Sequence, residues 1–235
     1  MPQQSSQLSQ LQHRIHMEFD TAADYIWKAP RLIQHEAVLE AKKLREYFPS
    51  GGEIAGFRWR RESEKLESCF PYLIAVGNLF SATSLFETYL MLIARILDEH
   101  FNSLSLCRRQ GISRIREFFS RIGLPESDLS TYRVTKHAVT IRNCLFHCSG
   151  VLSWSRDSES LRRLVRDGRY LSADHLALRI EQGGAFDEVQ IVSSFLGERI
   201  QVDNSYSHLV CAYFRDHLLQ LTDAAEALMP PHMKS

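Results

Sequence analysis

Three polar side chains near the middle of the chain have the types and the spacing needed for acid–base chemistry on a phosphate group. Arg142 and Asn143 are adjacent, and His147 follows four residues after Asn143. Arg can hold phosphate oxygens through two N–H bonds, His can transfer a proton near neutral pH, and Asn can orient an imidazole, a water or a ribose hydroxyl. Residues four apart share one face of an α-helix, so Asn143 and His147 should point the same way if this segment is helical.

Those three roles are the ones that cleavage of an RNA phosphodiester requires. One group activates the 2′-hydroxyl or protonates the leaving oxygen, and another stabilises the charge that builds up at phosphorus. This route needs no metal ion. We therefore interpret Arg142 as the phosphate-binding residue, His147 as the general acid or base, and Asn143 as an orienting residue.

The elements before this motif follow a helical pattern. Apolar residues recur every three or four positions over Ser9–Lys28 and over Leu32–Phe48, and Ala29-Pro30 predicts a break between these two helices. Pro49–Gly52 predicts a second break. Beyond it, Glu53–Glu67 mixes aromatic and charged residues and is interpreted as a loop or a short helix.

Two further helices lead to the helix that must carry the motif. Pro71–Phe101 is apolar nearly all round, which is typical of a central buried helix. Gly111–Ile122 predicts a short amphipathic helix. Ser127 or Asp128 can cap the motif helix, which is expected to end near Cys148.

The pattern changes after the motif. We expect a short helix at Ser158–Arg166 and short strands at Leu176–Glu181, Glu188–Ser193 and Glu198–Val202. An Asp, Asn or Ser within 203–205 can cap a last helix that runs to Met229.

These elements predict one mainly α domain over residues 1–235, a helical bundle with a small β insertion of two or three short strands before the last helix. The N-terminal helical extension is expected at 1–50, the core helices at about 70–150 and 204–229, and the β insertion at about 170–203.

The motif resembles that of the HEPN family, whose members are compact helical bundles. Its catalytic members carry Arg-x(4–6)-His at the end of a helix, often with Asn directly after the Arg. The corresponding run here is Ile141-Arg-Asn-Cys-Leu-Phe-His147-Cys-Ser-Gly150. Upstream, Ser81–Leu90 is similar to the first core helix of the family, with the acidic Glu87 in an apolar helix. The resemblance covers roughly residues 70–150 and the last helix.

The resemblance implies a metal-independent endoribonuclease that leaves a 2′,3′-cyclic phosphate and a 5′-hydroxyl. It also implies a homodimer in which one cleft holds two copies of Arg142 and His147, and a role in host defence or toxin–antitoxin systems with an antitoxin or defence partner. Glu87 is expected either to orient these residues or to be a buried carboxylate with a structural partner. Cys144 and Cys148 depart from the family pattern. The alternative function is a catalytically silent HEPN-type module that binds a nucleotide or a protein.

The basic residues are concentrated around the motif. The chain has 28 Lys and Arg and 28 Asp and Glu, but residues 106–169 carry 13 basic and 6 acidic side chains, a net charge of +7. We expect Arg108, Arg109 and Lys136 to contact RNA phosphates and Trp154 to stack on a base. The alternative is that the basic side chains form a solvated face and that the Trp belongs to the core.

Composition favours a cytoplasmic protein that uses no cofactor. The chain is 44% hydrophobic and 24% charged, which excludes intrinsic disorder. Five cysteines without regular spacing are a poor disulfide framework, and no signal peptide is visible. Cys144, His147 and Cys148 lack a second ligand pair, so no metal site is predicted. Phe70–Leu97 contains polar residues, so a core helix is expected rather than a membrane span.

Overall fold

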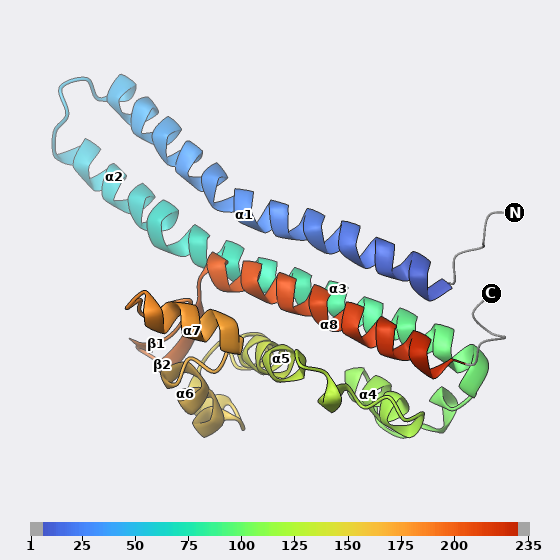
Figure 1. The fold of residues 1–235 in the computed structure, drawn as a ribbon. Coiled ribbons are helices and arrows are strands. Elements are labelled where there is room, and N and C mark those ends of the chain that lie inside the picture. Colours follow the sequence, from blue (N-terminus) through green and yellow to red (C-terminus); the bar gives the residue numbers. More distant parts are fainter. Residues whose placement is uncertain (1–6, 230–235) are drawn as a thin grey trace, which may run out of the picture.

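The computed structural model describes residues 7–229, in which long helices lying side by side form the main layer of the fold (Figure 1). These helices are α1 (Gln7–Tyr47), α3 (Phe70–Phe101) and α8 (Asn204–Leu228). Their apolar faces meet in one core, where the rings of Phe86 and Phe214 stack with centroids 4.2 Å apart. The shorter elements lie along one side of this layer (Figure 1).

α1 is one continuous helix, so the predicted break at Ala29-Pro30 is wrong. Pro30 has no N–H and cannot donate to the carbonyl of Ile26, four residues earlier. The side-chain amide of Asn204, at the start of α8, donates to that carbonyl at 2.7 Å. The amide of Asn78 in α3 donates in turn to the side-chain oxygen of Asn204 at 2.8 Å. A tertiary contact thus replaces the hydrogen bond that the proline removes, and the helix continues.

The sequence predicts a loop or a short helix at residues 53–67, and the structure has a helix there, α2 (Glu53–Glu64). It leads through a π-helical turn at Lys65–Cys69 directly into α3. Gly51 and Gly52, with φ angles of 70° and 106°, reverse the chain between α1 and α2. The second half of α1 and α2 therefore form a helical hairpin that projects from the rest of the fold (Figure 1).

α3 is the long apolar helix predicted at 71–101, but it is buried along one face rather than all round. Leu73, for example, is 62% exposed. Within Glu53–Phe101, an 18-residue window has a mean hydropathy of 1.4 and is 33% buried. In the described part of the chain it is the one stretch long and apolar enough to cross a membrane, a test that the core helix of a soluble protein also passes.

A buried polar cluster joins α4 (Ile112–Arg121), the motif helix α5 (Tyr132–His147) and α8. Glu126, in the connection between α4 and α5, is 4% exposed. Its carboxylate accepts from Arg116 of α4 at 3.2 Å and lies 3.2 Å from the ring Nε2 of the fully buried His217 of α8. Since a buried carboxylate is stable only when it is paired, these contacts fix where α5 begins.

Neither of the residues predicted to cap α5 does so. Ser127 and Asp128 lie in a short 3₁₀ turn that starts at Glu126, and the residue directly before the helix is Thr131. The hydroxyl of Thr131 lies 2.9 Å from the ring Nδ1 of His217. The buried cluster therefore delays the start of the helix by one turn relative to the sequence prediction.

The region between α5 and α8 contains α6 (Ser158–Arg166), α7 (Ala173–Glu181), β1 (Val189–Ser194) and β2 (Gly197–Val202). The helix predicted at 158–166 is confirmed. The first of the three predicted strands, Leu176–Glu181, is wrong, because this segment is the second part of α7. The hydroxyl of Ser172 caps α7 by accepting from the N–H of His175 at 3.2 Å, which favours a helix over a strand.

β1 and β2 form an antiparallel hairpin in which Val189 pairs with Val202. The carboxylate of Asp203 then accepts from the N–H of Tyr206 at 2.8 Å and caps α8 as predicted. The structure therefore confirms a mainly α fold with a small two-stranded β insertion before the last helix.

Replacing Asn204 by Ala should destabilise the fold by about 2 kcal/mol, because the carbonyl of Ile26 and the amide of Asn78 both lose their partner. The loss should be smaller by about 1 kcal/mol in a Pro30→Ala background, where the new N–H of residue 30 can satisfy Ile26. Urea unfolding of the four proteins in this double-mutant cycle measures the coupling. Strictly additive losses would contradict the proposed role of Asn204.

Candidate functional site

The motif lies at the C-terminal end of α5, a helix with one face in the core. Ala138, Ile141 and Cys144 are buried on that face. Lys136 and His147 are exposed on the opposite side of the helix. The motif histidine therefore stands at the open end of a helix whose other face fixes its position.

The guanidinium of Arg142 is held between aromatic rings. It lies 5.8 Å from the ring centroid of Phe80 in α3 and 5.1 Å from that of Phe146, one turn later in α5. Its Nη1 donates to the side-chain oxygen of Asn143 at 3.0 Å. Its Nε is buried and has no hydrogen-bond partner within residues 7–229. The structure thus joins Arg142 to Asn143 and stabilises the cation on two aromatic faces.

His147 is the last residue of α5, and its ring meets the ring of Phe146 edge to face, with centroids 4.9 Å apart. Five helical positions separate Arg142 from His147, which is about 140° around the axis. The two motif residues therefore do not contact each other directly. Phe146, 57% exposed, touches both and links the guanidinium to the imidazole.

Asn143 shares the exposed side of α5 with His147, as their spacing predicts. No hydrogen bond joins the two side chains in the described part of the protein, and Asn143 instead accepts from Arg142. The orienting contact that the structure contains is therefore between Asn143 and the guanidinium.

The β insertion fixes the chain directly after the motif. Gly150, with φ of 78°, donates its N–H to the carbonyl of Cys144 at 3.0 Å and closes the end of α5. Its carbonyl accepts from the N–H of Ile200 in β2 at 2.9 Å. Arg199, also in β2, donates to the carbonyl of Ser149 at 2.7 Å through its Nη2. The insertion thus docks onto the turn that follows His147.

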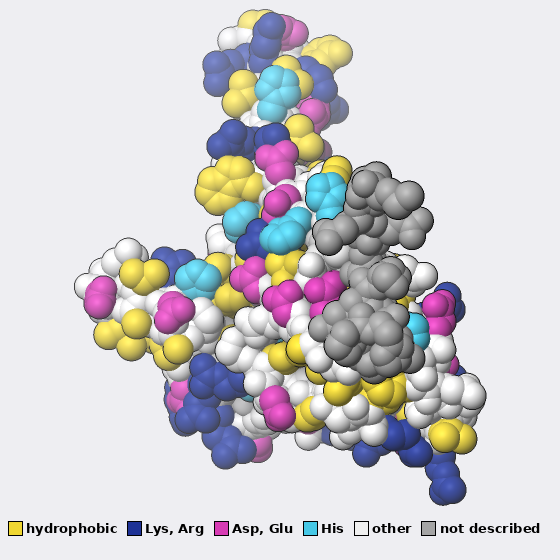
Figure 2. All heavy atoms as spheres, turned by 45° about the vertical axis from the view of Figure 1, so that its right-hand side comes forward, with side chains coloured by type: hydrophobic (Ala, Val, Ile, Leu, Met, Phe, Trp, Pro, Cys, Tyr) yellow, Lys and Arg dark blue, Asp and Glu magenta, His cyan; other side chains and the backbone are white. Residues whose placement is uncertain are grey.

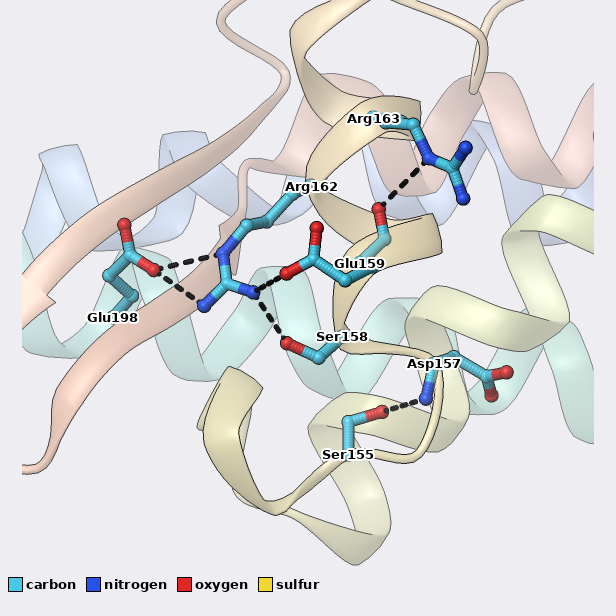
Figure 3. A network of polar contacts seen from close by, with 7 residues as sticks. All are labelled: Ser155, Asp157, Ser158, Glu159, Arg162, Arg163 and Glu198. Atoms are coloured by element: carbon cyan, nitrogen blue, oxygen red, sulfur yellow. Dashed lines mark hydrogen bonds and ion pairs between the residues drawn. The ribbon is translucent and has the colours of Figure 1, made fainter.

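Arg162 secures β2 on its other side (Figure 3). From α6 it donates to the Glu198 carboxylate at 2.8 and 3.0 Å, to Glu159 at 2.7 Å and to the hydroxyl of Ser158 at 2.8 Å. Two carboxylates therefore neutralise this arginine, and its contacts connect α6 to the hairpin that holds the end of the motif.

Two of the predicted RNA contacts lie away from the motif. The backbone N–H groups of Arg108 and Arg109, beyond the C-terminal end of α3, donate to the carboxylate of Glu117 at 3.5 and 3.2 Å. Phe80, which contacts Arg142, lies about 30 Å before that end along the helix axis. The structure does not bring these two arginines to the motif.

The other two predicted contacts lie nearer to it. Lys136 is exposed on α5 seven residues before Asn143, so the two share one side of the helix. Its ammonium is 5.9 Å from the ring of Tyr132. Trp154, 59% exposed, lies in the turn that follows the motif and is not a core residue. Trp154 is accessible beside the C-terminal end of α5, whereas Lys136 is exposed eleven residues before His147, about 16 Å away along the helix axis.

Glu87 is half-buried on α3, two helical turns after Phe80. None of the hydrogen bonds or ion pairs within residues 7–229 joins it to Arg142 or His147. The residue that α3 contributes to Arg142 is the aromatic Phe80. Sequence reasoning missed both ring partners of Arg142, although the four-residue spacing to Phe146 was a signal for one of them.

The basic residues of 106–169 are spread over elements that lie apart, because Arg108 and Arg109 follow the C-terminal end of α3 whereas Arg163 and Arg166 lie on α6 (Figure 1). On the face drawn in Figure 2, Lys and Arg side chains of the whole chain also lie in separate groups, some on the projecting end formed by α1 and α2, outside this segment, and others along the lower edge of the body. Several arginines of the segment are paired, as Arg116 is with Glu126, Arg121 with Glu117, and Arg162 with its two glutamates. The positive charge available to a ligand is therefore smaller than the sequence count.

The cysteines around His147 are core thiols. Burial raises the pKa of Cys144 to about 11, and Cys148 is half-buried. In the described residues, no group of three or more His, Cys, Asp or Glu side chains is arranged to hold a metal ion.

Comparison of the chain with protein-family models, with curated proteins and with solved structures gives no match. The resemblance to HEPN proteins therefore stays a prediction that rests on the motif and its position at the end of a helix.

Replacing Gly150 by Ala should cost about 3 kcal/mol of unfolding free energy. The position has φ of 78°, and a Cβ there would lie 2.8 Å from the carbonyl oxygen of Ile200. Gly183→Ala is the matched control, because its φ is 61° but open space surrounds it, so only the backbone cost of about 1 kcal/mol remains. Equal losses in the two variants would show that the close approach to β2 is unimportant.

Iodoacetamide at pH 7.5 should modify Cys69 first, since its thiol is exposed. Cys144 and Cys211, whose pKa values burial raises to about 11 and about 12, should stay unmodified in the native protein and react only after unfolding. Mass spectrometry of the peptides identifies the modified residue. Rapid native labelling of Cys144 would contradict a buried, protonated thiol beside the motif.

Proposed function

We propose that the protein is a metal-independent endoribonuclease that acts as a homodimer in the cytoplasm. The observation that carries the proposal is that Arg142 and His147 contact the same exposed aromatic ring, that of Phe146, at the open end of α5. A guanidinium, an imidazole and an accessible ring together suit a phosphate, a proton transfer and a neighbouring base.

The proposed reaction is an internal transfer at phosphorus. His147 accepts the proton of the ribose 2′-hydroxyl, the 2′-oxygen attacks phosphorus, and the bond from phosphorus to the 5′-oxygen breaks. The leaving 5′-oxygen takes a proton from an imidazolium. Arg142, positioned by Asn143 and the two rings, stabilises the charge on the phosphoryl oxygens. The products are a 2′,3′-cyclic phosphate and a 5′-hydroxyl.

A second copy of the chain supplies what one motif lacks. One imidazole cannot be both the base and the acid of a single concerted step, so two His147 side chains from facing copies suit the reaction better. Exposed apolar side chains around the motif, Phe146 and Trp154, together with Leu73 on the α3 face that carries Phe80, fit burial at such an interface. A role in host defence or as a toxin with an antitoxin partner follows from the resemblance and is part of the proposal.

The test is incubation of single-stranded RNA with the purified protein in EDTA. We expect cleavage to persist in EDTA and to fall at least 100-fold in both Arg142→Ala and His147→Ala, because each removes one chemical role. Arg31→Ala and His35→Ala, on exposed positions of α1, are controls of matched residue type and should retain activity. Sedimentation analysis should show a dimer, and circular dichroism verifies that each variant is folded.

Cleavage that requires Mg²⁺, or that survives both motif substitutions, would overturn this mechanism. RNA left intact by a folded dimer would favour the alternative, a catalytically silent module that binds a nucleotide or a protein. That alternative draws on the accessible Trp154 and Phe146, which can stack on a base without any chemistry.

A further inference from the structure

A second basic site lies on α5, away from Arg142. It is a cavity of about 450 Å³ between α5, α6 and the loop that follows α6. Its lining consists of Arg133, His137, Ser160, Arg163, Leu164, Arg166, Asp167 and Arg169. Four guanidinium groups thus line one cavity together with a single carboxylate.

The carboxylate is already occupied by two of the four arginines. Asp167 accepts from Arg166 at 2.9 Å and lies 3.3 Å from the Nε of Arg169. Arg133 and Arg163 form no ion pair with any carboxylate in the described part of the chain. Two of the four guanidiniums therefore have no carboxylate partner, and the lining carries four positive charges against one negative charge, a surplus that an anion from outside can neutralise.

Arg162 and its neighbour Arg163 show the difference between a guanidinium that is paired with carboxylates and one that is not (Figure 3). Arg162 is bound by two carboxylates and a hydroxyl. Within residues 7–229 the guanidinium of Arg163 makes one hydrogen bond, from its Nε to the backbone carbonyl of Glu159 at 3.4 Å. Its two terminal nitrogens point away from the carboxylates of Glu159 and Glu198 in Figure 3. The bond through Nε orients the guanidinium and leaves its terminal N–H groups available to a ligand.

His137 adds an imidazole to the lining of the cavity, and the positive charges around the cavity influence its pKa. Its ring Nδ1 lies 2.8 Å from the carbonyl of Arg169, which can only accept, so Nδ1 carries the proton and Nε2 is free of that bond. Burial lowers the pKa of His137, and the charges of Arg133, Lys136 and Arg169 lower it further. The surroundings of this ring are electropositive even though Asp167 lines the same cavity.

We propose that this cavity, which we call the α5–α6 pocket, binds a phosphate group of a nucleotide. Two guanidiniums that lack carboxylate partners, and a serine hydroxyl at Ser160, supply the N–H and O–H donors that phosphate oxygens accept. The lining contains one apolar side chain, Leu164, and no aromatic ring apart from the imidazole, so the pocket recognises the phosphate rather than the base.

The phosphate can belong to a free nucleotide or to an RNA strand. Arg133 is exposed on the side of α5 that carries Lys136 and His147, and the half-buried His137 follows one turn later. His137 lies ten residues before His147, which is about 15 Å along the helix axis. An RNA chain that reaches the motif can therefore also reach the pocket. Phosphate binding by the pocket does not depend on cleavage at the motif.

Titration calorimetry of the full chain in low salt tests the pocket with three probes: inorganic phosphate, adenosine 5′-monophosphate and a 2′-deoxy octanucleotide, which cannot be cleaved through a 2′-hydroxyl. We expect Arg133→Gln/Arg163→Gln to weaken binding of at least one probe tenfold or more. Arg163→Lys, which retains the charge but loses the planar fork, should weaken it less. Arg31→Gln/Arg95→Gln removes two exposed arginines elsewhere and should leave the affinity within twofold.

The pattern across the probes identifies the source of the phosphate. Binding of phosphate and the mononucleotide indicates a free nucleotide, whereas binding of the octanucleotide alone indicates a nucleic-acid strand. For the single strand, losing two phosphate contacts should reduce the salt dependence of affinity by about 1.4 in the log–log slope, because each contact contributes about 0.7. No binding of any probe, or equal binding by the pocket and control variants, would overturn the proposal. Retained binding in a His147→Ala protein that does not cleave RNA would separate the pocket from the proposed ribonuclease activity.

Discussion

The arrangement of the helices depends on how the carbonyl of Ile26 is satisfied. Pro30 removes its helical donor, and the amide of Asn204 replaces it while Asn78 holds the oxygen of the same side chain. One asparagine thus fixes α1, α3 and α8 relative to each other at one point. Phe80 is only two residues after Asn78, so the face of α3 that receives Arg142 is set by the same contact. A buried backbone carbonyl without a donor costs enough that this geometry leaves little freedom.

The motif helix α5 is fixed at both of its ends by contacts with residues that are far away in the sequence. The buried Glu126 and His217 determine where α5 starts, and β2 determines how the chain leaves it through Gly150 and Arg199. The imidazole of His147 lies between these two constraints, at the open end of the helix. An exposed side chain on a rigid helix keeps its position without losing access to a ligand.

The helical pattern predicted the main elements because apolar periodicity reports which face is buried, as for 71–101, 158–166 and the motif helix. The strand predicted at 176–181 missed a local signal, the Ser172 cap of α7, whereas the other two errors occurred where a distant residue decided the local structure. No local signal indicates that Asn204 rescues the helix at Pro30, or that a buried Glu126 shifts the start of α5 beyond Ser127 and Asp128. In the site, types and spacing predicted that Asn143 and His147 share a side of α5, but the aromatic partner Phe80 comes from a helix 60 residues earlier.

Whether each cation of a segment is paired with a carboxylate says more about ligand binding than the net charge of the segment does. The same stretch with a surplus of basic residues contains Arg116 and Arg162, whose charges carboxylates cancel, and Arg142, whose charge faces aromatic rings. An aromatic face stabilises a cation without neutralising it, so Arg142 keeps its full attraction for an anion although it is partly withdrawn from water. A desolvated cation of this kind interacts more strongly with an incoming phosphate than a solvated arginine does, because water screens it less.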